Sequence, residues 1–564
     1  MASGSLQKLL DQLEERRTQF GPGAAAKVLQ SLSPLAKLSF PDGASLIRFH
    51  ESLLFLRAFP QSPVVVRATE KLLRTFSSRI ASLPTGETDT DQFDSFEFAG
   101  IAGTTMQDAL SFDVVRWLIK EVPDAEICWD EAPVERAMAA VWPKFIPLLE
   151  EDANVEADTP WQHWLQTAKD KNNGLRWLIR QIENLPATDA EKSQLYDSLR
   201  LTVRWQLKNL RLSRTLNWKA VRKLFFHAAP LIGRREVSLA RELAQPPPRL
   251  HRLSHAEGEA VMDKIREIML VRYRELYGTT LGDPRSAVRA DLGRGVSIYL
   301  WNLPPARRLP LRAYVAGFTE KNGVPINYIE AIGLCQWMEL GFNTFYTFRG
   351  GEVAWVFSQA LRCLNSFTGA TCFSMYPYQL GHGNDEAIES GAFWFYRKMG
   401  FRPGRPDLLK LTEHEEVKMT RDKAYRTPPR ILRRLAQGHA FYEFAGSDVG
   451  AWDRFSLRNI GLKVSRRMSK EFGGDIQQFR KVAGTKLARL LGVNINSWST
   501  LERAAFENFA MVLYLVPGLH RWSEGDKQAL LRIIRAKPAG NEMLYLRLSQ
   551  QHARLRQALL KLGS

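Results

Sequence analysis

Cysteine is scarce in this chain of 564 residues, with thiols only at Cys128, Cys335, Cys363 and Cys372. So few and so scattered thiols cannot make the disulfide framework of a small secreted domain. No Cys-x-x-Cys pair occurs that would hold a structural zinc. We therefore expect a reducing interior as the environment of the protein.

Long hydrophobic runs are missing as well. The longest nearly uninterrupted apolar stretch, Phe509 to Gly518, is about half of a membrane span and contains Pro517. At the N-terminus, Lys8 and Asp11 arrive before any apolar run of signal-peptide length. The sequence predicts a cytoplasmic protein without a membrane span.

The composition is that of a folded protein, with 45% hydrophobic and 24% charged residues, and it excludes collagen-like and wholly disordered classes. The length predicts several domains, because domains usually hold about 100–200 residues. No fixed-period repeat is present that would indicate a solenoid.

The net charge of +18 is distributed unevenly. Residues 81–160 hold 18 acidic and four basic side chains, whereas residues 200–254 hold 13 basic and two acidic ones. Two interpretations stay open: the blocks of opposite sign dock on one another, or the basic block, with Arg204, Arg211 and Arg214, binds a nucleic acid or an acidic partner. No known nucleic-acid recognition module supports the second.

Three regions are expected. Residues 1–245 read as a helical N-terminal region, with amphipathic patterns at 46–56, 103–118, 161–182 and 193–212. The run Pro246-Pro247-Pro248 cannot continue a helix and marks the first boundary. Residues 250–410 predict an α/β domain, and residues 411–564 predict a helical C-terminal region with helices at 431–436, 501–515 and 542–562.

The central region alternates between helices and strands. A capping box at Ser254 and Glu257 predicts a helix to about Tyr277. Asn322-Gly323 predicts a hairpin within three antiparallel strands. The expected strands are 296–300, 311–318, 326–332, 342–348 and 370–376, and the expected later helices are 353–367, 385–398 and 408–419. A strand, a helix and a strand in succession predict a right-handed crossover, and therefore a sheet of mixed direction.

One motif in this region carries a family resemblance. The segment Ala392-Phe393-Trp394-Phe395-Tyr396-Arg397-Lys398-Met399-Gly400-Phe401 resembles the closing helix-to-strand signature of the GNAT superfamily of acyl-CoA-dependent N-acyltransferases. Upstream, Arg349-Gly350-Gly351-Glu352-Val353-Ala354 stands where that family has its pyrophosphate loop. The resemblance covers roughly residues 255–405 and implies a GNAT-like mixed sheet with crossover helices.

The resemblance also implies roles for residues. Arg349, Gly350, Gly351, Val353 and Ala354 would cradle the pyrophosphate of acyl-CoA or acetyl-CoA, since a glycine turn before a helix presents free N–H groups to an anion. No metal is implied.

The chemistry implied is the transfer of an acyl group to an amine. Tyr396 matches the tyrosine that protonates the departing sulfur. A base is expected on the antiparallel strands, with Glu330 as first choice and Glu339 as second. A backbone N–H around 346–348 would meet the oxyanion. A packing role for the Tyr396 ring and a solvated position for either glutamate stay open.

The competing interpretation is a non-catalytic helical interaction protein with a degenerate GNAT-like domain. Glu352 favours it, because the family usually has glycine there and a carboxylate repels a pyrophosphate. Three lesser candidates are a thiol–imidazole pair of Cys372 and His382, a metal site at His251 and His255, and the basic stretch 454–489. In this stretch, Phe455, Phe472 and Phe479 are candidates for base stacking, and the interleaved cations are candidates for contacts to phosphates. For each, a structural role is the favoured interpretation.

Overall fold

The structure is a computed structural model that describes residues 2–84, 90–129, 132–145, 152, 160–208 and 210–564. The described chain forms two compact units. Unit 1 holds residues 1–230, 262–280 and 322–325, and unit 2 holds residues 231–261, 281–321 and 326–564. No described helix is long and apolar enough to cross a membrane.

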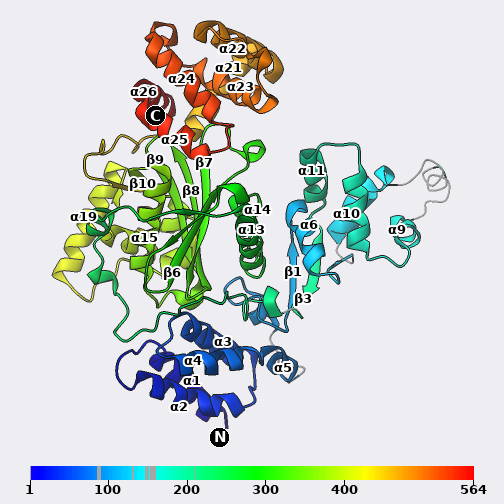
Figure 1. Ribbon diagram of the computed structural model, residues 1–564, viewed down its shortest axis with the longest axis vertical. Coiled ribbons are helices and arrows are strands. Elements are labelled where there is room, and N and C mark those ends of the chain that lie inside the picture. The colour runs from blue at the N-terminus through cyan, green and yellow to red at the C-terminus, as the bar shows by residue number, and fades with distance from the viewer. Residues whose placement is uncertain (1, 85–89, 130–131, 146–151, 153–159, 209) are drawn as a thin grey trace. The chain divides into compact units, whose positions relative to one another are not determined.

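Unit 1 begins with the helices α1 to α5 (Figure 1), and side chains such as Leu10, Leu53 and Phe76 are buried among them. Asp42 caps the central helix by accepting from the amide of Ser45, and Ser62 caps the next helix with Pro63 in the first turn. The helices are α1 (Ala2–Arg16), α2 (Ala24–Lys37), α3 (Gly43–Ala58), α4 (Pro63–Leu73) and α5 (Phe76–Ala81).

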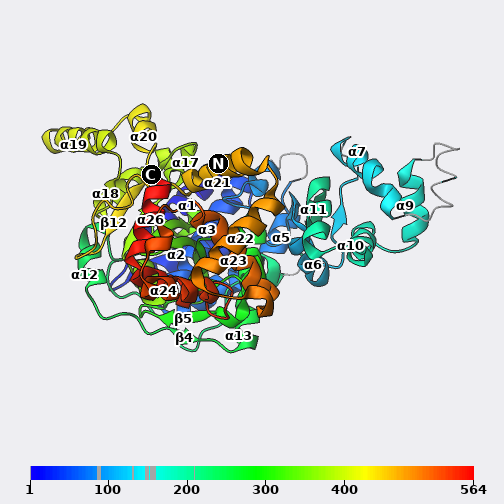
Figure 2. The ribbon, with the colours of Figure 1, turned by 90° about the horizontal axis from the view of Figure 1, so that it is seen from above.

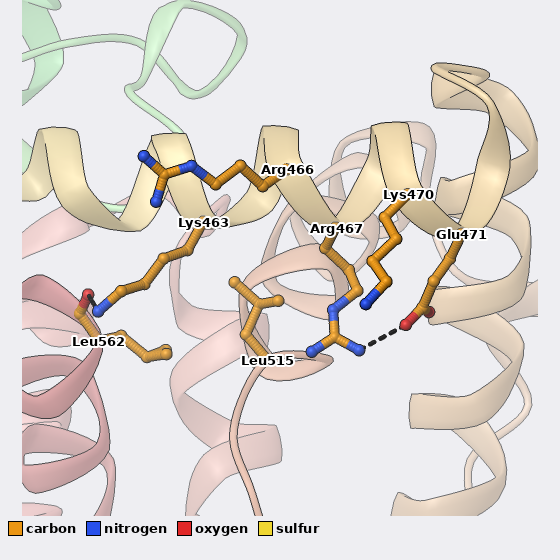
Figure 3. Close-up of a pocket in the computed structure, with 7 residues that line it drawn as sticks. All are labelled: Lys463, Arg466, Arg467, Lys470, Glu471, Leu515 and Leu562. Carbon is orange, nitrogen blue, oxygen red and sulfur yellow. Dashed lines mark hydrogen bonds and ion pairs between the residues drawn. The ribbon is translucent and has the colours of Figure 1, made fainter.

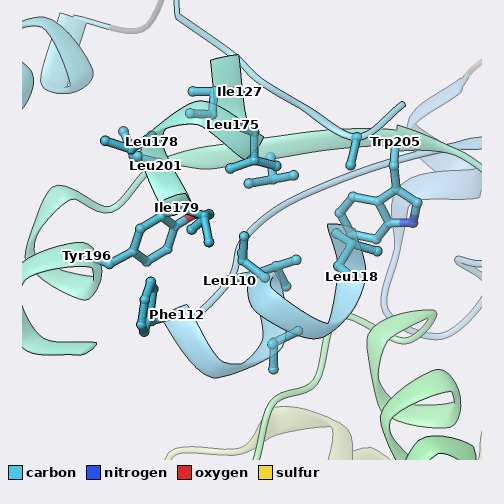
Figure 4. Packing of buried hydrophobic residues seen from close by; sticks show 14 of the residues in the cluster. Leu110, Phe112, Leu118, Ile127, Leu175, Leu178, Ile179, Tyr196, Leu201 and Trp205 are labelled. Carbon is cyan, nitrogen blue, oxygen red and sulfur yellow. The ribbon is translucent and has the colours of Figure 1, made fainter. Parts of the chain in front are cut away.

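The rest of unit 1 has a second apolar core, in which helices pack on a small sheet (Figure 4). Trp205, Leu178 and Tyr196 are among its buried residues. The strands, in the order β1-β3-β2, are β1 (Thr105–Ala109), β3 (Thr202–Gln206) and β2 (Glu126–Ile127). The helices are α6 (Phe112–Glu121), α7 (Ala132–Val141), α9 (Trp161–Lys169), α10 (Gly174–Asn184), α11 (Asp189–Leu199) and α14 (Tyr277–Thr280).

This sheet corrects the prediction of helices throughout residues 1–245. The helix expected over 103–118 begins only at Phe112, after strand β1, and the helix expected over 193–212 ends at Leu199. Thr105 pairs with Gln206 in an antiparallel ladder. Burial along β3 alternates, which is the period of a strand and not of a helix.

Unit 2 contains a nine-stranded sheet in the order β11-β12-β10-β9-β8-β7-β6-β5-β4. The strands are β4 (His251–Arg252), β5 (Val288–Asp291), β6 (Val296–Asn302), β7 (Ala313–Lys321), β8 (Val324–Leu334), β9 (Trp337–Thr344), β10 (Cys372–Met375), β11 (Arg402–Pro403) and β12 (Ala440–Glu443). The mixed α/β class that the sequence predicts is therefore confirmed.

Several local predictions for the sheet are confirmed. Asn322 and Gly323 both have positive φ and connect the neighbouring strands β7 and β8. Helix α15 (Val353–Thr368) crosses over to β10, which runs parallel to β9. Strand β9 itself lies earlier than the expected 342–348, because residues 346–348 form a 3-10 turn.

Three helices are shorter in the structure than the sequence patterns predict. The helix capped by Ser254 is α13 (His255–Leu270), whose residues from Met262 belong to unit 1. Gly391, with φ of 67°, separates α17 (Asp385–Glu389) from α18 (Ala392–Lys398). His552 separates α25 (Glu542–Gln551) from α26 (Ala553–Gly563).

Residues 411–564 are mostly helical, although β12 belongs to the sheet. The capping box of Ser499 and Glu502 is present. Along the chain, α19 and α20 lie between β11 and β12, which pair with each other. Figure 2 shows α19 and α20 next to each other. The remaining helices of unit 2 are α12 (Leu239–Leu243), α16 (Pro377–Leu380), α19 (Pro406–Arg421), α20 (Pro429–Leu435), α21 (Leu457–Phe472), α22 (Ile476–Leu491), α23 (Thr500–Leu513) and α24 (Glu524–Ala536).

Candidate active site

The parallel strands β9 and β10 have unequal lengths, and this leaves a gap in the ladder. Strand β10 ends at Met375, which pairs with Leu340. Strand β9 continues through Thr344 but in the described chain pairs there only with β8. Pro377 begins helix α16 and leads the chain out of the sheet. The carboxyl end of a parallel strand next to a crossover is where open α/β sheets bind ligands.

Backbone groups of β9 face this gap. The carbonyl of Gln336 accepts a hydrogen bond from the amide of Cys372, at 3.1 Å, so its peptide group is directed toward β10. In a strand, the N–H and C=O of one residue point to the same side, and those of the next residue point to the opposite side. Phe342 lies six residues after Gln336, so its N–H also points toward the side of β10. Because β10 has ended by then, this N–H is directed into the gap.

The loop that follows β9 is anchored by two buried aromatic residues and is exposed at its tip. Phe345 and Phe348 are buried, whereas Arg349 and Gly350 are exposed. A Cβ added to Gly350 would meet open space. Helix α15 then begins at Val353, and no side chain of the described residues caps it. The first amides of a helix have no partner within the helix, so those of α15 can donate to an anion at the positive end of the helix dipole.

The carboxylate of Glu352 does not occupy this helix end. It is buried and accepts hydrogen bonds from Lys321, at 3.2 Å, from the amide of Ile232, at 3.1 Å, and from Arg294. Burial alone would raise the pKa of Glu352, but the hydrogen bond from Arg294 and the charge of Lys321 hold this pKa below its ordinary value. Arg294 and Lys321 compensate the negative charge of Glu352. The repulsion expected between this carboxylate and a pyrophosphate is therefore offset locally.

The two faces of the sheet differ at this point. Phe342 contacts Phe357 of α15, with 5.1 Å between ring centroids, so the side chain of Phe342 faces α15. Its neighbour Gly341 is directed to the other face and pairs with Glu330. Glu339 is two residues before Gly341 and shares that face. The two carboxylates considered as bases therefore lie on the face opposite α15.

Tyr396 lies on the α15 face. Its ring packs against Phe357 at 5.5 Å and Phe401 at 5.9 Å between centroids, and its side chain is buried. Among the described residues its hydroxyl has no hydrogen-bond partner. Burial raises the pKa of Tyr396, so the phenol stays protonated at neutral pH. Tyr396 and Glu330 thus lie on opposite faces of the sheet: Glu330 pairs with Gly341, and Phe357 packs against both Tyr396 and Phe342.

Each carboxylate has its own polar partners. Tyr314 of β7 donates to Glu330. Burial raises the pKa of Glu330, and the hydrogen bond from Tyr314 opposes this rise. Glu339 contacts Nε2 of His439 at 2.9 Å and Arg312 at 3.5 Å. The motifs at 349–354 and 392–401 do not reveal these partners, because Arg312, Tyr314 and His439 lie far from both motifs along the chain.

Exposed aromatic side chains surround the carboxyl ends of β9 and β10. Tyr346, Tyr376 and Tyr378 are 48%, 50% and 51% exposed. Arg349 lies over the ring of Tyr346, at 5.5 Å from its centroid, and pairs with Glu386. The three tyrosines come directly after two adjacent strands, and this position in the sequence is a signal for a binding site that the motifs alone do not give.

The structure places the remaining candidates from the sequence as follows. His382 is exposed, whereas Cys372 is buried in β10 with a raised pKa. His251 is exposed on β4, and His255 contacts Glu259 at 3.6 Å. The described residues contain no group of three or more side chains suited to hold a metal ion.

The basic block of unit 1 is partly engaged internally. Arg214 is buried and donates to Glu51. Its side chain is therefore not accessible to a nucleic acid or an acidic partner protein. Lys208 pairs with Asp124 of the acidic block, at 3.0 Å. Arg204 donates to Gln107 at 3.3 Å. The Lys208–Asp124 pair agrees with the interpretation in which the two blocks meet each other.

Comparisons with known proteins give no match: no family model, no curated protein and no solved structure resembles this chain significantly.

Proposed function

We propose that unit 2 is an N-acyltransferase that moves an acyl group from acyl-CoA to an amine. The observation that carries the proposal is the gap beside Gly341 and Phe342: Glu330 pairs with Gly341 across the sheet, and Tyr396 lies on the opposite face, where Phe357 contacts both Tyr396 and Phe342. The resemblance of residues 392–401 to the GNAT signature supports it. The antiparallel pair β11–β12 also follows the Gly400-Phe401 step, as a strand hairpin does in that family, here with α19 and α20 inserted.

The pyrophosphate is assigned to the loop from Arg349 to Ala354. The free amides of the first turn of α15 supply hydrogen-bond donors, and Gly350 leaves space for the phosphates to approach the backbone. Glu352 stays compatible with this assignment, because Arg294 and Lys321 hold its carboxylate away from the helix end. Arg349 is partly exposed at the tip, where it pairs with Glu386 and would have to exchange this partner for the phosphates.

The reaction needs one proton acceptor and one proton donor. The amine nitrogen attacks the thioester carbonyl carbon, a C–N bond forms and the C–S bond breaks. Glu330 accepts the proton of the amine, and a carboxylate whose pKa is raised is better matched to this task near neutral pH. Tyr396 donates a proton to the departing thiolate, and both groups then exchange protons with solvent.

The oxyanion of the tetrahedral intermediate is assigned to the N–H of Phe342. This amide is directed into the gap. The sequence suggests an amide within residues 346–348 for this role, but the amide of Phe348 donates to the carbonyl of Phe345 at 2.9 Å. A donor fixed by a strand needs no reorganisation when the charge develops.

The competing interaction-protein interpretation finds less support. It used Glu352 as evidence against CoA binding and Arg214 as a contact to nucleic acid. The carboxylate of Glu352 is compensated, and Arg214 is buried against Glu51. We therefore place acyl transfer first.

Titration of acetyl-CoA into the full-length protein tests the cofactor claim. A calorimetric titration is expected to give saturable heat with one site per chain. Release of free CoA thiol in the presence of a panel of primary amines then tests the transfer. Absence of any saturable heat would reject the proposal.

A further inference from the structure

A basic groove lies on the C-terminal helices of unit 2, away from the candidate active site in the chain. It has a volume of about 320 Å³. Four cations of α21 line it with the spacing of one helix face, and the other lining residues come from α21, the chain after α23, and α26 (Figure 3). The lining residues are Lys463, Arg466, Arg467, Lys470, Glu471, Leu515 and Leu562.

Two of the four cations are held by the protein. Lys463 donates to the carbonyl of Leu562 at 2.8 Å, and Arg467 donates to Glu471 at 2.5 Å. Figure 3 shows Arg467 and Lys470 extending from α21 toward Leu515, while Arg466 runs along the helix. Within the described chain, Arg466 and Lys470 have no acidic partner. The groove therefore has a surplus of positive charge.

This surplus is unfavourable without an anion. Like charges three and four residues apart on a helix repel one another. Lys470 lies in the last turn of α21, where the helix dipole favours a cation, but Arg466 does not gain from this. Ile460 is the only fully buried residue of α21, so the helix is a surface element that presents its charges to solvent.

Two of the three phenylalanines considered for base stacking, Phe455 and Phe479, are not accessible to bases. Phe472 and Phe479 stack on each other with 4.8 Å between centroids, and Tyr514 packs against Phe479 at 5.5 Å. Phe455 and Phe479 are buried. Base stacking by these residues, considered from the sequence, is therefore wrong for Phe455 and Phe479.

We propose that this groove binds a small polyanion that carries two or more phosphate groups. The four cations span about 10 Å along α21, from the rise of an α-helix, which suits a short ligand better than a long strand. The volume lies at the lower end of the range of small-molecule sites. Guanidinium and ammonium donors bind phosphate through charge-assisted hydrogen bonds.

The test uses inorganic tripolyphosphate and the full-length protein at low ionic strength. Wild type is expected to bind one tripolyphosphate per chain in a calorimetric titration. The variant R466Q/K470Q is expected to bind at least tenfold more weakly. The control R454Q/R458Q removes the same number of exposed charges outside the groove and is expected to stay within twofold of wild type. Equal weakening in both variants, or no saturable binding to wild type, would overturn the proposal.

A second arm distinguishes the source of the phosphates. A single-stranded oligonucleotide of twenty residues is expected to bind no more tightly than tripolyphosphate. If it binds more than tenfold more tightly and the R466Q/K470Q variant loses this binding, the groove is a nucleic-acid site and the assignment to a small ligand is wrong. Both substituted side chains are exposed, so the unfolding temperature of the unliganded variant is expected to be unchanged or slightly raised.

Discussion

The carboxylate of Glu352 and the ammonium of Lys321 form a buried ion pair, with 3.2 Å between Oε2 and Nζ and no exposed surface on either side chain. Arg294 donates to the same carboxylate. The pair joins the end of β7 to the residue before α15. It therefore holds the N-terminus of α15 in place and keeps the carboxylate away from the free amides of the first turn.

Removal of this carboxylate is expected to destabilise the protein strongly. Glu352→Ala leaves the buried Lys321 uncompensated on that side, and breaking one partner of a buried pair costs about 3–5 kcal/mol of unfolding free energy. Urea denaturation followed by tryptophan fluorescence measures this change. The matched control is Glu386→Gln, which removes a partly exposed partner of Arg349 and should cost about 1 kcal/mol or less. Similar losses in both variants would contradict the structural role given to Glu352.

The pKa of Lys321 predicts a dependence of stability on pH. Burial lowers this pKa from 10.5 to about 8, although Glu352 opposes the shift. Between these two values the unfolded chain binds more protons at this site than the folded chain does, so the contribution of Lys321 to stability rises with pH. Unfolding free energies measured from pH 8 to pH 10 for wild type and Lys321→Met are expected to diverge, with a steeper rise for wild type. Parallel curves would contradict the lowered pKa.

Tyr396→Phe separates a catalytic role from a packing role. The hydroxyl has no partner among the described residues, so its removal is expected to change the unfolding temperature very little. If Tyr396 protonates the thiolate, kcat should fall by about a hundredfold or more, with little change in KM for acetyl-CoA. An unchanged kcat would assign Tyr396 to packing alone.

Glu330 is tested through the pH profile of the reaction. Glu330→Gln is expected to lower kcat by about a hundredfold to ten-thousandfold and to remove the fall of activity on the acidic side. Tyr314→Phe removes the hydrogen bond that lowers the pKa of Glu330, so the acidic limb should move to higher pH. The same two measurements on Glu339→Gln decide between the candidate bases. An acidic limb that persists in Glu330→Gln and disappears in Glu339→Gln would transfer the role to Glu339.

The parts of the fold that local chemistry determines were predictable from the sequence. Asn322-Gly323 specifies its hairpin by tolerance of positive φ, and Ser499 with Glu502 specifies a helix start by hydrogen bonds within four residues. Strands β1 and β3 were not predictable, because each depends on a partner about a hundred residues away. Long-range pairing leaves little trace in a local pattern.

The candidate site was predictable only in part. The position of the loop at Arg349 and of Tyr396 follows from their motifs, but the gap arises because β10 ends at Met375 while β9 continues. The compensation of Glu352 requires Arg294 and Lys321, which come from the β5–β6 turn and from β7. No pattern around Glu352 reveals either cation.

The most direct test of the account is the binding of acetyl-CoA to two variants of one exposed glycine. Gly350 has ordinary φ and open space around it, so both Gly350→Asp and Gly350→Asn should fold as wild type does. If the N-terminus of α15 holds the pyrophosphate, calorimetric titration should show at least tenfold weaker binding to Gly350→Asp, because its carboxylate repels the phosphates, and nearly wild-type binding to Gly350→Asn. Equal affinities for the two variants would contradict the placement of the pyrophosphate at this helix.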